Sequence, residues 1–119
     1  MSITSFTQLD VWKKAHQVTM WVYDLTEKFP RHQLFTLVSQ MQRAAYSIPS
    51  NIAEGFGRRR PLDKARLYNI AFSSGEELKY FLILSKARGY RKDDPVLDQT
   101  LEDVSGMLRR LEDAILAGA

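Results

Sequence analysis

Residues 95–117 read PVLDQTLEDVSGMLRRLEDAILA. Apolar side chains alternate spacings of four and three through this stretch without a miss. Such a heptad seam is typical of a helix that packs lengthwise in a bundle or against a partner helix. Asp94 and Pro95 suit the N-cap and the first helical position, so we predict a helix over 95–117. The seam consists of Leu97, Leu101, Val104, Leu108, Leu111 and Ile115.

The first part of the chain predicts a helix over 8–29. Its apolar side chains recur at spacings of three and four, which marks one buried stripe. Thr7 and Asp10 have the spacing of a capping box, and Phe6 and Val11 have that of a hydrophobic staple. Pro30 is expected to end the helix. The stripe consists of Val11, Ala15, Val18, Val22, Leu25 and Phe29.

A second helix is predicted over 33–55, with Pro49 inside its apolar pattern. Proline lacks an N–H and clashes with the carbonyl four residues earlier, here that of Ala45. We therefore expect a kink rather than two helices, with Asn51 as a candidate donor to the freed carbonyl. Gly55 and Gly57 supply the C-terminal breakers.

A third helix is predicted over 61–88, with Pro61 in its first turn. The small residues Ser73, Ser74 and Gly75 near its middle indicate close approach of a neighbouring helix. Because the connections are short, sequential helices are expected to be antiparallel neighbours. The sequence thus predicts an all-α, up-down-up-down antiparallel four-helix bundle, one domain over 1–119.

The composition of the 119 residues is that of a globular protein, with 45% hydrophobic and 26% charged residues. No apolar run approaches the roughly 20 residues that span a bilayer, so no membrane contact is expected. The stretch Met1–Leu9 lacks the pattern of a secretory signal, and the chain has no cysteine. A cytoplasmic location is the expectation.

Charge is distributed unevenly along the chain. Residues 1–92 carry 15 Lys/Arg and 7 Asp/Glu, whereas residues 93–119 carry 2 and 7, which together give the net charge of +3. A basic body with an acidic final segment can attract a polyanion or can pair with itself between subunits.

No catalytic, metal-binding or cofactor-binding set is found in the sequence. Neither His16 nor His32 has a carboxylate at the Glu-x-x-His spacing of di-iron bundles. Glu76 and Glu77 are adjacent on a helix and point about 100° apart, so they do not form a carboxylate pair. No arginine precedes a histidine at the spacing that helical-bundle ribonucleases use. We therefore expect no enzyme activity and no cofactor.

A polar strip runs along the second predicted helix, where Arg43, Ser47, Asn51 and Glu54 fall at spacings of four, four and three. If buried, such a strip must be hydrogen-bonded internally, for example from Arg43 to a carboxylate. A network that fixes helix register is the favoured interpretation, and a ligand-binding groove is the alternative.

A cluster of cations follows this strip. Arginine forks pair well with phosphates, and a nearby helix N-terminus adds positive potential. Contact with a nucleic-acid backbone is one interpretation, and a solvated loop is the other. The cluster comprises Arg58, Arg59, Arg60, Lys64 and Arg66.

The segment RAAYSIPSNIAEGFGRRR at 43–60, with VWKKA before it and LYNIA and ARGY after it, carries a family resemblance. From Phe6 to about Leu111 the chain resembles the bacterial four-helix-bundle proteins encoded by intervening sequences of 23S ribosomal RNA genes, often called S23 ribosomal proteins. The accessory variability determinant of diversity-generating retroelements belongs to the same broad group. The signature residues that carry over are Arg43, Ser47, Pro49, Asn51, Glu54, Gly55, Arg58 and Glu77.

This resemblance implies ring-like homopentamers. It also implies, from the retroelement members, nucleic-acid binding and contact with a reverse transcriptase. No catalytic role comes with it. One departure is Ser73-Ser74-Gly75, where the family usually has Gly-Ser-Leu, and this raises the question of local helix packing. The combined expectation is a non-enzymatic, oligomeric protein that binds RNA or DNA through the phosphate backbone; the alternative is a ring-shaped protein-interaction scaffold.

Overall fold

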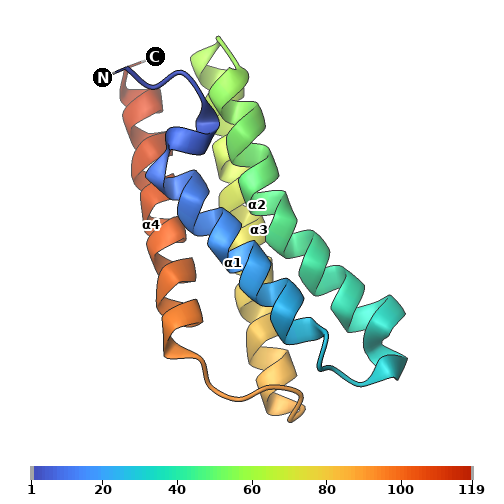
Figure 1. Cartoon of the computed structure of the whole chain (residues 1–119). Coiled ribbons are helices and arrows are strands. Elements are labelled where there is room, and N and C mark those ends of the chain that lie inside the picture. Colours follow the sequence, from blue (N-terminus) through green and yellow to red (C-terminus); the bar gives the residue numbers. More distant parts are fainter. Residues whose placement is uncertain (1, 119) are drawn as a thin grey trace.

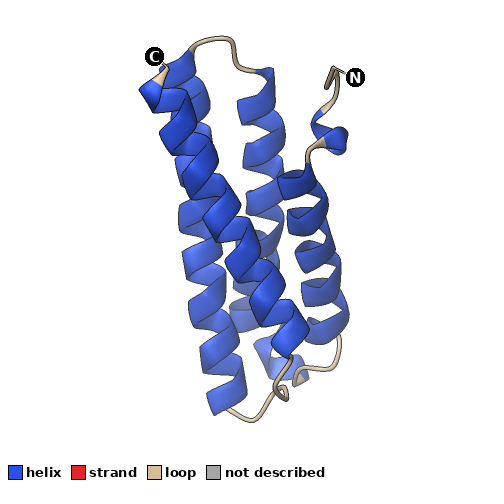
Figure 2. Cartoon of the chain, turned by 90° about the vertical axis from the view of Figure 1, so that its left-hand side faces the viewer, coloured by secondary structure: helices blue, strands red, loops and turns tan. Residues whose placement is uncertain are grey.

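The computed structural model describes residues 2–118, in which four long α-helices account for most of the chain. They are α1 (Asp10–Thr26), α2 (Ser39–Gly57), α3 (Pro61–Ala87) and α4 (Pro95–Ala117). Consecutive helices run antiparallel and side by side, and α1 closes the bundle against α4 (Figures 1 and 2). The predicted four-helix bundle is confirmed.

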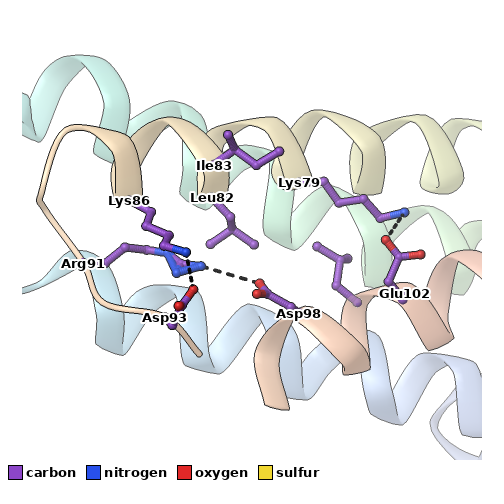
Figure 3. A pocket seen from close by; sticks show the side chains of 9 residues that line it. Lys79, Leu82, Ile83, Lys86, Arg91, Asp93, Asp98 and Glu102 are labelled. Atoms are coloured by element: carbon purple, nitrogen blue, oxygen red, sulfur yellow. Dashed lines mark hydrogen bonds and ion pairs between the residues drawn. The ribbon is translucent and has the colours of Figure 1, made fainter. Parts of the chain in front are cut away.

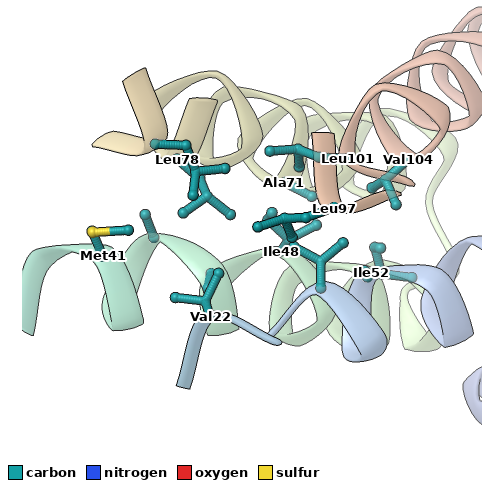
Figure 4. Close-up of a cluster of buried hydrophobic side chains, with 14 of the residues drawn as sticks. Val22, Met41, Ile48, Ile52, Ala71, Leu78, Leu97, Leu101 and Val104 are labelled. Atoms are coloured by element: carbon teal, nitrogen blue, oxygen red, sulfur yellow. The ribbon is translucent and has the colours of Figure 1, made fainter. Parts of the chain in front are cut away.

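The core is built from the stripes that the sequence marks (Figure 4). In α4 the seam is buried from Leu97 through Leu108, and both of these side chains are 1% exposed. Burying a leucine of this kind stabilises the fold by about 1.5–3 kcal/mol. Leu111 is only partly buried, because it borders an open groove that Leu9 and Val11 also line.

The start of α1 differs from the prediction. Ser5 and Gln8 form the capping box, around the short 3₁₀-helix η1 (Phe6–Gln8), so the box assigned to Thr7 and Asp10 is wrong. Ser5 Oγ accepts from the amide of Thr7 at 3.2 Å, and Gln8 Oε1 accepts from the amide of Ser5 at 3.0 Å. Serine followed by glutamine three residues later is an equally good capping pair, and it lies two residues earlier. The Phe6 ring packs edge-on against Trp12, at 5.3 Å between centroids.

The segment between α1 and α2 is more irregular than the predicted ranges 8–29 and 33–55. Helix α1 ends at Thr26, after which Phe29 turns inward and its ring lies 5.7 Å from that of Tyr90. A 3₁₀-helix, η2 (Arg31–Gln33), and a π-helix, η3 (Leu34–Val38), then lead into α2. This irregular path buries the end of η3 in the core and leaves its second residue, Phe35, 88% exposed.

Helix α2 runs through Pro49 without a break because another helix supplies the missing donor. The hydroxyl of Thr19 in α1 lies 3.1 Å from the carbonyl oxygen of Ala45, the acceptor that Pro49 leaves free. The same hydroxyl is 2.9 Å from the carbonyl oxygen of Ala15. The prediction that Asn51 serves this carbonyl is wrong, because Asn51 bonds to Ser47 instead.

None of the helices within residues 2–118 is long and apolar enough to cross a membrane.

Candidate nucleic-acid interface and the α2–α3 network

The turn that carries the arginine cluster is held between the end of α2 and the start of α3. Gly55 is buried against the ring of Tyr68: a Cβ atom at position 55 would lie 2.7 Å from Cε1 of that ring. A side chain is therefore excluded by close approach rather than by an unusual backbone angle. Pro61 stands at the start of α3, as predicted, with Asp63 in its first turn.

Lys64 closes the end of α2. Its ammonium group donates to the carbonyl oxygens of Gly55 at 2.7 Å and Phe56 at 2.9 Å, which are among the carbonyls that a helix end leaves unpaired. The same nitrogen lies 5.6 Å from the Phe56 ring centre and 5.9 Å from that of Tyr68. Burial lowers the pKa of Lys64. Lys64 therefore belongs to the scaffold of the turn and is set apart from the exposed cations of the cluster.

The other four members of the cluster are exposed. Arg58 lies 3.9 Å from Glu54 one turn earlier, an open ion pair of little strength. Within the described residues, Arg59, Arg60 and Arg66 form no ion pair, so their guanidinium groups are available to an external anion.

The structure adds a cation that the sequence-based cluster misses. Arg109 of the acidic segment lies over the Phe72 ring, with 4.0 Å between its guanidinium carbon and the ring centre. Because α4 is antiparallel to α3, this contact lies in the same half of the bundle as the arginine turn (Figure 1). Charge counting along the chain does not single it out, because Arg109 belongs to the acidic segment 93–119.

Two members of the polar strip of α2 form a hydrogen-bond network, and the other two are exposed to solvent. Asn51 Nδ2 donates to the carbonyl of Ser47 at 2.7 Å and lies 3.0 Å from its hydroxyl, which in turn lies 2.9 Å from the hydroxyl of Ser74 in α3. These three side chains link α2 to α3 at one register. Arg43 and Glu54 are exposed and outside this network. No carboxylate among the described residues pairs with Arg43, which corrects the expected ion pair.

Gly75 is buried in α3, within the triplet that departs from the usual family pattern. A Cβ atom at this position would lie 3.5 Å from Ser105 Oγ and 3.8 Å from Leu101 Cδ1, which is ordinary van der Waals contact with α4. The preceding Ser74 supplies the hydroxyl that Ser47 contacts. Glu77, by contrast, is exposed. The small triplet thus serves two helix contacts at once.

The fold and the signature residues define a small helical-bundle protein whose α2 and α3 are linked through Ser47, Asn51 and Ser74. Residues 7–111 match the profile of the family described as 23S rRNA-intervening sequence protein, and the chain belongs to this family. A crystal structure of a protein of unknown function from the S23 ribosomal protein family of Bacteroides thetaiotaomicron is similar in fold. It aligns with a TM-score of 0.79 at 21% identity, over 87% of this chain and 95% of that one. No curated protein matches the sequence.

Proposed function

We propose that this protein is a non-enzymatic, oligomeric nucleic-acid-binding protein that contacts phosphates through the turn between α2 and α3. The observation that carries the proposal is the exposure of Arg58, Arg59 and Arg60 on a turn fixed at both ends. Arginine forks on a rigid support lose little freedom when they bind phosphate oxygens. Phosphate contacts position a nucleic acid without reading bases, so weak sequence preference is expected. Arg66 lies one turn into α3 and extends the same surface.

The oligomeric part of the proposal rests on the family resemblance, which implies a ring of five subunits. The acidic α4 of one subunit facing the basic surface of the next would make a heterologous contact that closes into a ring. A ring would also repeat the arginine turn, and this raises avidity for a polyanion without any new contact. We place this activity in the cytoplasm, because a protein without cysteine needs no disulfide bond and therefore no oxidising compartment.

The experiment compares two triple variants of equal charge. The triple variant Arg58→Ala/Arg59→Ala/Arg60→Ala removes the three arginine side chains of the turn. The control variant Lys28→Ala/Arg31→Ala/Arg88→Ala removes three exposed cations at the opposite end of the bundle. Binding of structured RNA and of single-stranded DNA is measured across a salt series. The turn variant is expected to weaken binding and to reduce the salt slope by about 2 to 3, since each phosphate contact contributes about 0.9. The proposal fails if binding is undetectable at low salt, or if the control variant has the same effect.

A protein-interaction scaffold is the second candidate function, and one feature of α3 favours it. Tyr80 and Ile83 lie three residues apart on that helix and are 57% and 66% exposed, and neighbouring exposed apolar side chains are typical of an interaction surface. A stable protein partner, for example a reverse transcriptase as in the retroelement group, would cover these side chains. A complex that survives salt and nuclease in the wild type, but not in Tyr80→Glu/Ile83→Glu, supports this second function.

A further inference from the structure

Arg109 and Phe72 form a surface contact along the edge where α4 lies against α3. The guanidinium carbon of Arg109 is 4.0 Å from the centre of the Phe72 ring. The ring is half-buried and packs against the hydrophobic core, so it is a fixed support. Arg109 itself is exposed, and the ring covers only one face of its planar guanidinium group. The opposite face of this group is therefore open to solvent.

Arg109 differs from other cations along this edge because no carboxylate neutralises it. Further along α3, Lys79 is paired with Glu102 of α4 at 3.0 Å (Figure 3). Near the end of α3, Lys86 is paired with Asp93. Arg109 forms no ion pair with any residue between 2 and 118. Its charge and its outer face are both available to a ligand.

The charges near Arg109 favour a neutral ring over a phosphate as the group that stacks there. Glu112 and Asp113 lie three and four residues after Arg109 in α4, on the same side of that helix. These carboxylates repel the negative charge of a phosphate, but they do not repel a nucleobase. Every nucleobase has a π-face that can stack on an arginine plane. The base is also the part of a nucleic acid that the arginine turn leaves without a contact.

The contact is within reach of a strand that is bound at the arginine turn. From Pro61 to Phe72, α3 rises by roughly 16 Å, at about 1.5 Å per residue. A strand with a rise of about 3.4 Å per nucleotide covers this length with about five nucleotides. Arg66 is exposed between the two positions and can bind a phosphate on the way.

We propose that Arg109, supported by Phe72, is a stacking platform for an unpaired base of a strand whose phosphates contact the arginine turn. The inference rests on the proposed nucleic-acid-binding function and extends it, because phosphates are displayed by paired and unpaired strands alike. In a duplex each base is stacked between its neighbours, so its faces are covered. The platform therefore adds affinity for single strands of RNA or DNA that a duplex does not gain.

The test measures fluorescence anisotropy of labelled probes at constant salt. The first probe is an oligo-adenine single strand of about eight nucleotides, which is long enough to join the turn and the platform. It is used as DNA and as RNA. The second is an abasic strand with the same number of phosphates, and the third is a duplex of the same length. The wild type is expected to bind the adenine strand at least about fivefold more tightly than the abasic strand.

Two substitutions locate the platform. Arg109→Lys keeps the charge but removes the guanidinium plane, and it is expected to weaken the adenine strand at least about fivefold. Binding of the abasic strand and of the duplex is expected to stay unchanged. Phe72→Leu removes the supporting ring and is expected to act in the same way. The control is Arg110→Lys, because Arg110 is exposed and its guanidinium group lies beside Gly106 instead of a ring.

Arg109 is exposed, so Arg109→Lys folds even if Phe72→Leu does not, and it then decides alone. Unchanged binding of the adenine strand by Arg109→Lys overturns the proposal, because a charge at this position would then be sufficient. Equal affinity of the wild type for the adenine and abasic strands overturns it too. Both results leave the proposed function intact if binding of the abasic strand still depends on Arg58, Arg59 and Arg60. No binding of any probe at low salt overturns the platform and the proposed function together.

Discussion

The ammonium group of Lys64 lies 2.7 Å from the carbonyl oxygen of Gly55, nine residues earlier in the chain. A residue that charge counting assigns to a phosphate-binding cluster thus closes the end of α2 instead. This hydrogen bond holds the start of α3 against the end of α2, and it thereby fixes the turn from which the three arginines extend.

Lys64→Met is expected to lower the free energy of unfolding by about 1–2 kcal/mol, because two carbonyls at the end of α2 lose a charged donor. Urea unfolding measures this. Arg66→Met is the matched control, since Arg66 is exposed and its loss is expected to leave stability within about 0.5 kcal/mol. Equal stability of the two variants would contradict the capping role of Lys64.

Gly55→Ala is expected to destabilise the fold by about 1–3 kcal/mol, because the added methyl group meets the Tyr68 ring and the packing must shift. Gly57→Ala is the control two residues later. No atom lies within 4 Å of a Cβ atom there, so that change should leave stability unaltered or raise it by up to about 1 kcal/mol. Thermal and urea unfolding of both variants check this difference, and a tolerated alanine at position 55 would refute it.

Thr19→Val is expected to cost about 1–3 kcal/mol, because it strips the buried carbonyl of Ala45 of its donor while keeping the shape of the side chain. Thr100→Val provides the comparison. The Thr100 hydroxyl donates to the carbonyl of Val96 in an exposed hydrogen bond within α4, so its loss should be nearly neutral. If both substitutions had the same small effect, Thr19 would not be the partner that lets α2 continue through Pro49.

Lys86→Gln is expected to reduce the acid sensitivity of the fold. The hydrogen bond and charge of Lys86 lower the pKa of Asp93 below its ordinary value of 3.8. A carboxyl with a lowered folded-state pKa contributes stability above its ordinary value, and this is lost as pH falls through the folded value. In Lys86→Gln the pKa of Asp93 should rise toward 3.8, and the loss of stability below about pH 4 should become shallower.

Carboxyl NMR titration of Asp93 and urea unfolding between pH 2 and pH 6, a range of about two units on either side of that ordinary value, measure this effect. Lys92→Gln removes an exposed charge next to Asp93 and serves as the control. An Asp93 pKa that stays low in Lys86→Gln would show that another group holds it there.

Much of the fold can be predicted from the sequence because its signals are local. The seam of α4, the stripe of α1 and the helix starts at Pro61 and Pro95 depend on signals within one or two turns of helix. The ends of α1 and α2 were less predictable. Ser5 competes with Thr7 for the same capping role, and the buried Phe29 and Val38 draw the segment between the helices off a regular path.

The candidate site was predictable only in part, for the same reason. Runs such as Arg58 to Arg60 are visible in the sequence, and they are exposed in the structure. Which cation closes a helix, which stacks on a ring and which is buried depends on helix register. Lys64, Arg109 and Arg91 show these three outcomes, and their sequence neighbours give no indication of them.

By itself the sequence determined four helices, their order and the faces they bury, because periodicity of 3.6 residues and the chemistry of proline and glycine are properties of short segments. Only the tertiary structure decided how the polar groups between helices are satisfied. Thr19 reaches Ala45 across 26 residues, and Ser47 reaches Ser74 across 27. The packing of the apolar stripes sets the register of neighbouring helices. That register then determines which donors and acceptors lie within hydrogen-bond distance of one another.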